Sequence, residues 1–220
     1  MGFNNIDIEK LNILVSTQLN SFFYDGVEVN KNLLRRYQTH TIDRLYICFK
    51  HIKKPYFYEN DRAIFNYFNG DHYSMYLYLL CNTIWKLDKN ENLASKIFLL
   101  NKALHGIDAF YSIDLPEIFL FVHPIGTVLG KATYSDYFVV YQNCTIGAND
   151  NCSYPTFKGA SVMYSKTSII GSCEIGSNTI FGANSFLMDT NIEDNKVVVG
   201  SYPNNKIIQN SSSVIDRVFK

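Results

Sequence analysis

The two halves of the chain repeat their apolar residues with different periods. Through residues 1 to about 110, apolar residues recur every three or four positions, which is the spacing of one face of a helix. We expect helices over approximately residues 6–23, 30–37, 42–49, 73–87 and 91–104. Asn30 is a suitable N-cap for the second helix, and the third must end before Pro55. The clusters at 69–71 and 88–90 predict loops.

The second half repeats every six residues. Large apolar residues stand at Phe157, Met163, Ile169, Ile175, Phe181 and Leu187. The residue four positions after each is small or polar, namely Ser161, Thr167, Cys173, Thr179, Ser185 and Asn191. Neither a helix nor an ordinary strand has this period, whereas a parallel β-helix does. In such a coil three flat faces close a triangle, and the large residues fill its interior.

A second six-residue register lies upstream of the first. It comprises Val122, Val128, Tyr134, Val140 and Ile146. Ile146 and Phe157 are eleven residues apart instead of twelve, so the two registers are out of phase. We therefore expect residues 148–155 to form a loop expelled from one corner of the coil. Such loops often lie on the binding face of a solenoid.

These periods together predict an α+β fold with three parts. Residues 1–110 would form an α-helical domain, and residues 111–200 a left-handed parallel β-helix of hexapeptide repeats. Residues 201–220 would form a C-terminal tail.

Composition and charge exclude several classes of protein. Lys plus Arg and Asp plus Glu both number 20, and the zero net charge argues against a nucleic-acid-binding surface. The five cysteines are scattered without a CxxC pair, which favours small core residues in a reducing compartment. The N-terminus lacks the basic and apolar regions of a signal peptide, and the apolar stretch 75–85 is too short to span a bilayer. We expect a cytoplasmic protein.

Of the five histidines, His123 alone lies in the repeat region. A γ-class carbonic anhydrase has the same β-helix but needs three zinc-binding histidines, so one histidine excludes that enzyme. We therefore expect no metal site.

The residues around His123 resemble the serine acetyltransferases. Val122–Gly130 is similar to that family's segment His-Ala-Thr-Gly-Ile-Val-Val-Gly, and residues 141–147 are similar to its Leu-Gln-Ser-Val-Thr-Leu-Gly at the same distance. Residues 154–156 resemble its His-Pro-Lys, and residues 182–185 and 199–203 resemble its closing elements. The resemblance covers residues 106–208, and the helical first half fits the family's layout in outline.

The resemblance implies transfer of an acetyl group from acetyl-CoA, the co-substrate, to a hydroxyl, with His123 as general base. A hydroxyl is a poor nucleophile until a base removes its proton, and imidazole, with a pKa near ~6.5, suits that task. The histidine would return the proton to the CoA thiolate, and no covalent intermediate is required.

Two departures from the family bear on the acceptor. Val122 stands where the family has an aspartate, and Tyr154 stands where it has a second histidine. Both family residues help to form the serine pocket, so we favour a sugar or polysaccharide hydroxyl as the acceptor. Tyr154 could hydrogen-bond the acceptor hydroxyl or the thioester carbonyl, or simply stack within its loop.

The family also implies an aspartate that orients the histidine from fifteen residues upstream. Asp108 has that offset, whereas Asp114 has the more similar local context. Both remain candidates, together with Glu117 if the first coil starts near Pro116.

The resemblance further implies a CoA groove and an oligomer. Ser165 and Ala183 match small residues along the pantetheine arm, and Lys206 matches a basic residue near a CoA phosphate. The family implies a trimer, or a dimer of trimers, with active sites shared between neighbours. Two alternatives are a true serine O-acetyltransferase of cysteine biosynthesis and an inactive β-helix that serves as a scaffold or CoA-binding module.

Overall fold

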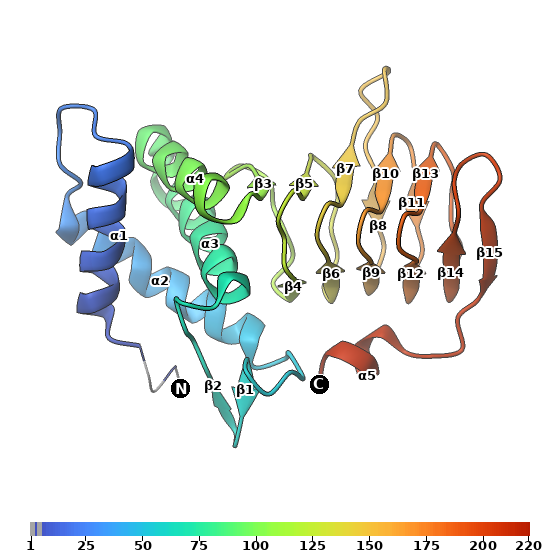
Figure 1. Ribbon diagram of the computed structural model, residues 1–220, viewed down its shortest axis with the longest axis horizontal. Helices are drawn as coiled ribbons and strands as arrows, with labels where there is room; N and C mark the ends of the chain where they lie inside the picture. The colour runs from blue at the N-terminus through green and yellow to red at the C-terminus, as the bar shows by residue number, and fades with distance from the viewer. Residues whose placement is uncertain (1–2, 4–5) are drawn as a thin grey trace.

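The computed structural model describes residue 3 and residues 6–220. A helical region and a parallel β-solenoid lie end to end along the long axis of the molecule (Figure 1). The predicted order of a helical part followed by a parallel β-helix is therefore confirmed. No helix in the described part of the chain is long and apolar enough to cross a membrane.

Four helices form the first region: α1 (Ile8–Phe22), α2 (Lys31–Phe49), α3 (Gly70–Asp88) and α4 (Glu91–His105). The two helices expected over 30–37 and 42–49 are one helix, α2, because Gln38 and Thr41 in its middle are buried and hydrogen-bonded. Asn30 caps α2 as predicted, and its side chain accepts the Leu33 N–H at 3.0 Å.

Helix α3 is the centre of the helical region, and its residues from 71 to 84 are buried. It starts three residues earlier than expected, because the Asn69 side chain caps a first turn that includes Gly70 and Asp71. The expectation of a loop at 69–71 was therefore wrong. A short hairpin, β1 (Tyr58–Glu59) and β2 (Arg62–Ala63), precedes it.

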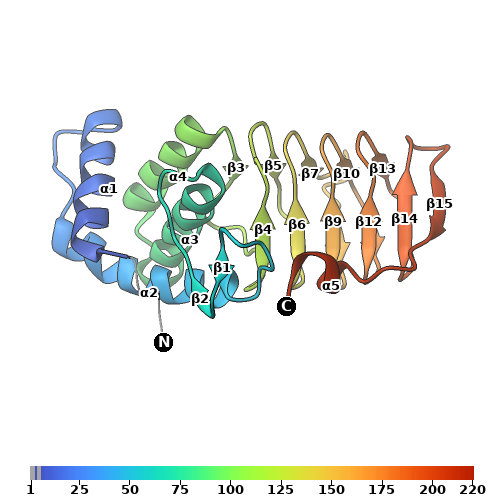
Figure 2. The same ribbon diagram turned by 60° about the horizontal axis from the view of Figure 1, so that its bottom comes forward.

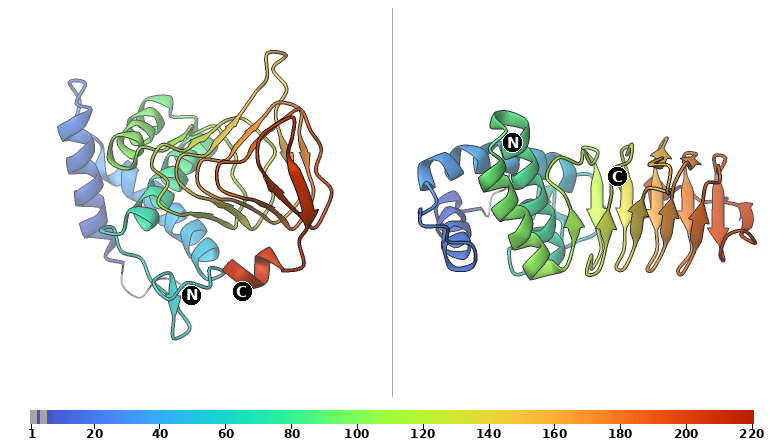
Figure 3. Two further views of the ribbon diagram at one scale, coloured as in Figure 1. Left: turned by 45° about the vertical axis from the view of Figure 1, so that its right-hand side comes forward. Right: turned by 90° about the horizontal axis from the view of Figure 1, so that it is seen from above.

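The solenoid has three faces, which Figure 3 shows as a triangle in its left view. One face contains β4 (Phe119–Phe121), β6 (Phe138–Val140), β9 (Ser161–Met163), β12 (Thr179–Phe181) and β14 (Lys196–Val199), followed by the antiparallel β15 (Lys206–Gln209). The second contains β3 (Asp108–Ala109), β5 (Val128–Leu129), β7 (Thr145–Gly147), β10 (Ser168–Ile170) and β13 (Phe186–Met188). The third contains β8 (Thr156–Phe157) and β11 (Glu174–Ile175).

The downstream hexapeptide columns fill the solenoid as predicted. All six large residues from Phe157 to Leu187 are buried, and all the small residues from Ser161 to Ser185 are buried as well. Asn191, the last of the small column, is exposed. Ser168 pairs with Phe186, 18 residues later, whereas Thr145 pairs with Ser168, 23 residues later. The additional residues form the predicted loop over 148–155, which projects from the solenoid after β7 (Figure 1).

The upstream register was wrong at two positions. Val128 is 41% exposed, and its neighbour Leu129 fills the interior at 1% exposed and pairs with Ile146. In the same way, Phe121 pairs with Val140 and occupies the interior column instead of Val122. The cause is the corner between β4 and β5, which holds more residues than the equivalent corner of the other coils.

The tail runs back along the solenoid towards the helices, as Figure 2 shows for α5 (Val214–Val218). Its successive residues hydrogen-bond to successively earlier parts of the chain. The Asn210 N–H donates to the Asn195 carbonyl, and the Val214 N–H donates to the Asn178 side chain. Further along, Arg217 donates to the Tyr164 hydroxyl. The Lys220 N–H finally donates to the His51 carbonyl, in the helical region.

Candidate active site

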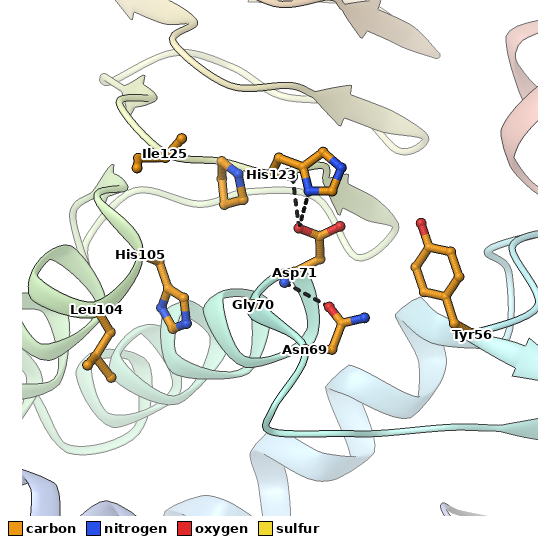
Figure 4. A pocket seen from close by; sticks show the side chains of 9 residues that line it. Tyr56, Asn69, Gly70, Asp71, Leu104, His105, His123 and Ile125 are labelled. Carbon is orange, nitrogen blue, oxygen red and sulfur yellow. Dashed lines mark hydrogen bonds and ion pairs between the residues drawn. The ribbon is translucent and has the colours of Figure 1, made fainter.

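A pocket lies where the helical region meets the first corners of the solenoid. It has a volume of about 530 Å³ and is lined by residues from four places: Tyr56 before β1; Asn69, Gly70 and Asp71 at the start of α3; Leu104 and His105 at the end of α4; and His123, Pro124 and Ile125 after β4. Figure 4 shows the imidazole of His123 above the start of α3, with His105 on the other side of Gly70. The pocket brings a helix N-terminus and two histidines together.

His123 occupies an enlarged corner. The N–H groups of Val122, Tyr141 and Tyr164 each bind the carbonyl of the next coil, so these three residues are equivalent. Gly126 in the first coil and Asn143 in the second are the equivalent left-handed residues that close this corner, because the Asn143 N–H binds the carbonyl of Ile125, the residue before Gly126. Three residues therefore separate Val122 from Gly126, where one separates Tyr141 from Asn143.

The two additional residues push His123 outward. Its side chain is 75% exposed, and its backbone has φ +49°, in the left-handed region that histidine adopts more readily than most residues. The enlarged corner thus presents an imidazole to solvent from a rigid scaffold, which is how a base can meet a substrate.

Asp71 is the carboxylate that meets His123. Its Oδ1 accepts the His123 backbone N–H at 2.8 Å and lies 3.7 Å from the ring Nδ1 (Figure 4). The Asp71 side chain is 7% exposed. Burial raises its pKa, while the His123 N–H and the charge of Lys54 act in the opposite direction. A carboxylate at this position favours the hydrogen on Nδ1 and leaves Nε2 free to act as a base.

The carboxylates expected to orient His123 have other partners. Asp108 pairs with Lys102 at 2.6 Å, and Asp114 pairs with Lys86 at 2.8 Å. Among the described residues, His123 forms its ion pair with Asp71. Sequence reasoning missed Asp71 because it is 52 residues from His123, and its position in the first turn of α3 was the only available signal.

His105 is the second imidazole of the pocket and was not anticipated. Burial lowers its pKa to about 4. The lining residues include no lysine or arginine, although the charge of Lys54 reaches Asp71. Within the described residues, no group of three or more His, Cys, Asp or Glu side chains is placed to hold a metal ion.

A continuous track leads from the His123 corner along the solenoid. The carbonyls of Ile125, Gln142 and Ser165 each accept an N–H from the next coil, at 2.9, 3.0 and 2.9 Å, so these residues stack with Ala183 on one corner. Lys206 pairs with Val199 at the far end of the solenoid. The side-chain Oε1 of Gln142 is buried and has no hydrogen-bond partner among the described residues.

Tyr154 lies apart from this pocket, in the projecting loop over 148–155. It is 38% exposed, and the ammonium of Lys131 lies 5.6 Å from the centre of its ring. Within one chain, the structure therefore does not bring Tyr154 to His123.

The arrangement of helices and solenoid is shared with solved serine acetyltransferases. The enzyme from Brucella abortus strain S19 matches with a TM-score of 0.69 at 14% identity, over 96% of this chain and 87% of that one. The Neisseria gonorrhoeae serine acetyltransferase matches with a TM-score of 0.68 at 18% identity, over 92% and 80%. A serine acetyltransferase in complex with CoA matches with a TM-score of 0.69 at 14% identity, over 90% and 83%.

These comparisons establish the fold of the whole chain, helical region included. No protein-family profile matches the chain, and no curated protein matches its sequence.

Proposed function

We propose that this protein is an acetyl-CoA-dependent O-acetyltransferase with His123 as its general base. The observation that supports the proposal best is the exposed His123 imidazole beside the buried carboxylate of Asp71, in a pocket large enough for a small acceptor. The likeness to serine acetyltransferase structures agrees with this chemistry.

In the proposed reaction, His123 Nε2 removes the proton from an acceptor hydroxyl as its oxygen attacks the thioester carbonyl. The new C–O bond forms a tetrahedral intermediate, which collapses with loss of the CoA thiolate. The imidazolium then returns its proton to that sulfur. Asp71 stabilises the imidazolium while it exists, because the carboxylate lies 3.7 Å from Nδ1.

CoA would occupy the corner track that begins at His123. The small residues Ser165 and Ala183 leave its backbone accessible to the pantetheine arm. Lys206 at the far end would meet a CoA phosphate. The thioester would then lie between this track and the pocket.

We infer that the acceptor is a neutral sugar or polysaccharide hydroxyl. The pocket lining has no lysine or arginine to bind the carboxylate of free serine, and Val122 is an apolar residue that is 3% exposed. The alternative acceptor, serine, is supported by the fold shared with serine acetyltransferases. In that case Asp71 would bind the serine ammonium.

The proposal includes a trimer in which neighbouring copies share active sites. Tyr154 would then reach a neighbour's site, because its loop projects away from the solenoid of its own chain (Figure 3). A monomer in light scattering would contradict this part of the proposal, and it would exclude a role for Tyr154 in catalysis.

The test is release of CoA from acetyl-CoA with a panel of sugars and with free L-serine as acceptors. We expect turnover with a sugar and a loss of at least about 100-fold in His123→Ala, which is the usual contribution of a general base. His40→Ala is the matched control, because His40 is exposed on α2 and lies outside the pocket. Near-normal activity of His123→Ala would refute the base. Intact CoA binding without any acceptor would instead indicate a CoA-binding module.

A further inference from the structure

His105 has a defined position in the pocket that the proposed chemistry does not use. It is the last residue of α4, and its ring meets Tyr73 edge-on, with centroids 5.7 Å apart. Its Cδ2 would lie 3.8 Å from a Cβ on Gly70, so the ring rests against the start of α3. Figure 4 shows it across the pocket from His123.

The hydrogen bonds behind His105 determine which ring nitrogen bears the hydrogen. The buried Asn101 donates from its Nδ2 to the Ser74 carbonyl at 2.9 Å, which fixes the orientation of the amide. Its Oδ1 therefore faces His105 Nδ1, at 2.9 Å. An amide oxygen can only accept, so Nδ1 must be the donor.

It follows that His105 offers a hydrogen-bond acceptor to a ligand. With the hydrogen on Nδ1, the neutral ring has a lone pair on Nε2. Burial favours the neutral ring by lowering its pKa to about 4, so the imidazole stays uncharged at pH 7. His105 thus differs from His123, which has a carboxylate beside it.

We propose that His105 Nε2 accepts a hydrogen bond from a non-reacting hydroxyl of the acceptor, and that it selects neutral polyols over free amino acids. This rests on the proposed function. Besides its reacting hydroxyl, free serine has its ammonium as a donor, and the Asp71 carboxylate would bind that group. Its carboxylate offers no hydrogen to the Nε2 lone pair, whereas a sugar has several further hydroxyl donors. A site built to pair with a substrate hydroxyl discriminates strongly against an analogue that lacks it.

The position of His105 favours the acceptor over CoA as the donor. Ser165 and Ala183 follow His123 along the solenoid, away from the helices. His105 lies on the opposite side, at the end of α4, where Gly106 and Gly126 link the helical region to the first corner. The acceptor and the pantetheine arm would therefore approach His123 from opposite directions.

The first test is independent of turnover. Nitrogen-15 NMR of labelled histidine, with His105 assigned from the spectrum of His105→Phe, should show the Nδ1–H tautomer. An Nε2–H tautomer would overturn the proposal. Titration with methyl glycosides of glucose, galactose and mannose should shift the His105 signals, and L-serine should not. No shift with any glycoside, or a shift with L-serine, would also overturn it.

The second test separates the acceptor from CoA. His105→Phe should raise the KM for the sugar acceptor about five- to tenfold, as expected for one neutral hydrogen bond, with kcat changed less than about threefold. His105→Gln restores an acceptor oxygen and should recover part of the loss. His51→Phe, outside the pocket, is the control. An unchanged acceptor KM, or a rise in the KM for acetyl-CoA instead, would refute the assignment. If the wild type transfers no acetyl group, the proposed function fails, while the NMR result still decides the role of His105.

Discussion

Replacing Asp71 by asparagine changes the charge beside His123 while it keeps the shape of the side chain. The asparagine Oδ1 can still accept the His123 backbone N–H, which the carboxylate accepts at 2.8 Å. What is lost is the negative charge 3.7 Å from Nδ1. Asp71→Asn therefore isolates the electrostatic support of the imidazolium from the support of the left-handed corner.

The size of the effect follows from distance and exposure. Two unit charges 3.7 Å apart interact by about 4.5 kcal/mol at an effective dielectric constant of about 20. Because the His123 side chain is 75% exposed, solvent screens most of this, and about 1 kcal/mol remains. We expect a roughly fivefold fall in kcat for Asp71→Asn, with little change in KM. Asp71→Ala also removes the backbone acceptor at φ +49° and should lose more.

The assay is steady-state CoA release, with Asp108→Asn measured in parallel. Asp108 undergoes the same chemical change, but its partner is Lys102. A kcat for Asp71→Asn within twofold of the wild type would refute the role given to Asp71. A roughly fivefold fall in Asp108→Asn instead would restore the sequence-based candidate.

The same substitution should stabilise the protein at neutral pH. Burial raises the pKa of Asp71, so the folded state disfavours its ionised form. That penalty is absent below the unfolded pKa near 3.8 and is present in full above the raised folded pKa. We expect Asp71→Asn to raise Tm at pH 7 and to leave it unchanged at pH 3. A loss of Tm at pH 7 would show that the carboxylate is stabilising.

Three further predictions concern stability. Burial lowers the pKa of His72 to about 4, so the free energy of unfolding should fall by up to about 3 kcal/mol between pH 6.5 and 4. Urea titrations of His72→Phe over this pH range should show a smaller fall. Leu129→Ala should lose about 2–5 kcal/mol in urea unfolding and Val128→Ala about 0.5, since only the first fills the interior. Gly130→Ala places a Cβ 2.4 Å from a main-chain oxygen and should lower Tm, whereas Gly147→Ala meets only a movable methyl at 3.3 Å and should not.

The sequence was most informative where the coil is regular. Between Phe157 and Leu187 paired residues of successive coils are 18 residues apart, so a six-residue column leads directly to the interior. Upstream, the enlarged corner at His123 displaced the register, and Val128 was exchanged with Leu129. The six-residue repeat does not show where extra residues are inserted, because the insertion at this corner occurs once and is not repeated in the other coils.

The site was predictable only in part, for a related reason. His123 lies in a local motif, whereas its partner comes from a helix 52 residues away. Asp71 and His105 are brought to it by the packing of α3 and α4 against the first coils, which no local pattern records. Asp108 and Asp114 are closer to His123 in the sequence, but each pairs with a lysine, and the sequence alone does not predict these ion pairs.

The returning tail changes how the solenoid should unfold. In a stack of repeats each coil contacts its neighbours alone, so the last coil can fray independently of the rest. Here the tail joins the coils of Asn195, Asn178 and Tyr164 to one another and then to His51 in the helical region. The last coil cannot open without releasing this long-range connection. A structure built from one-dimensional repeats thereby becomes a single cooperative unit.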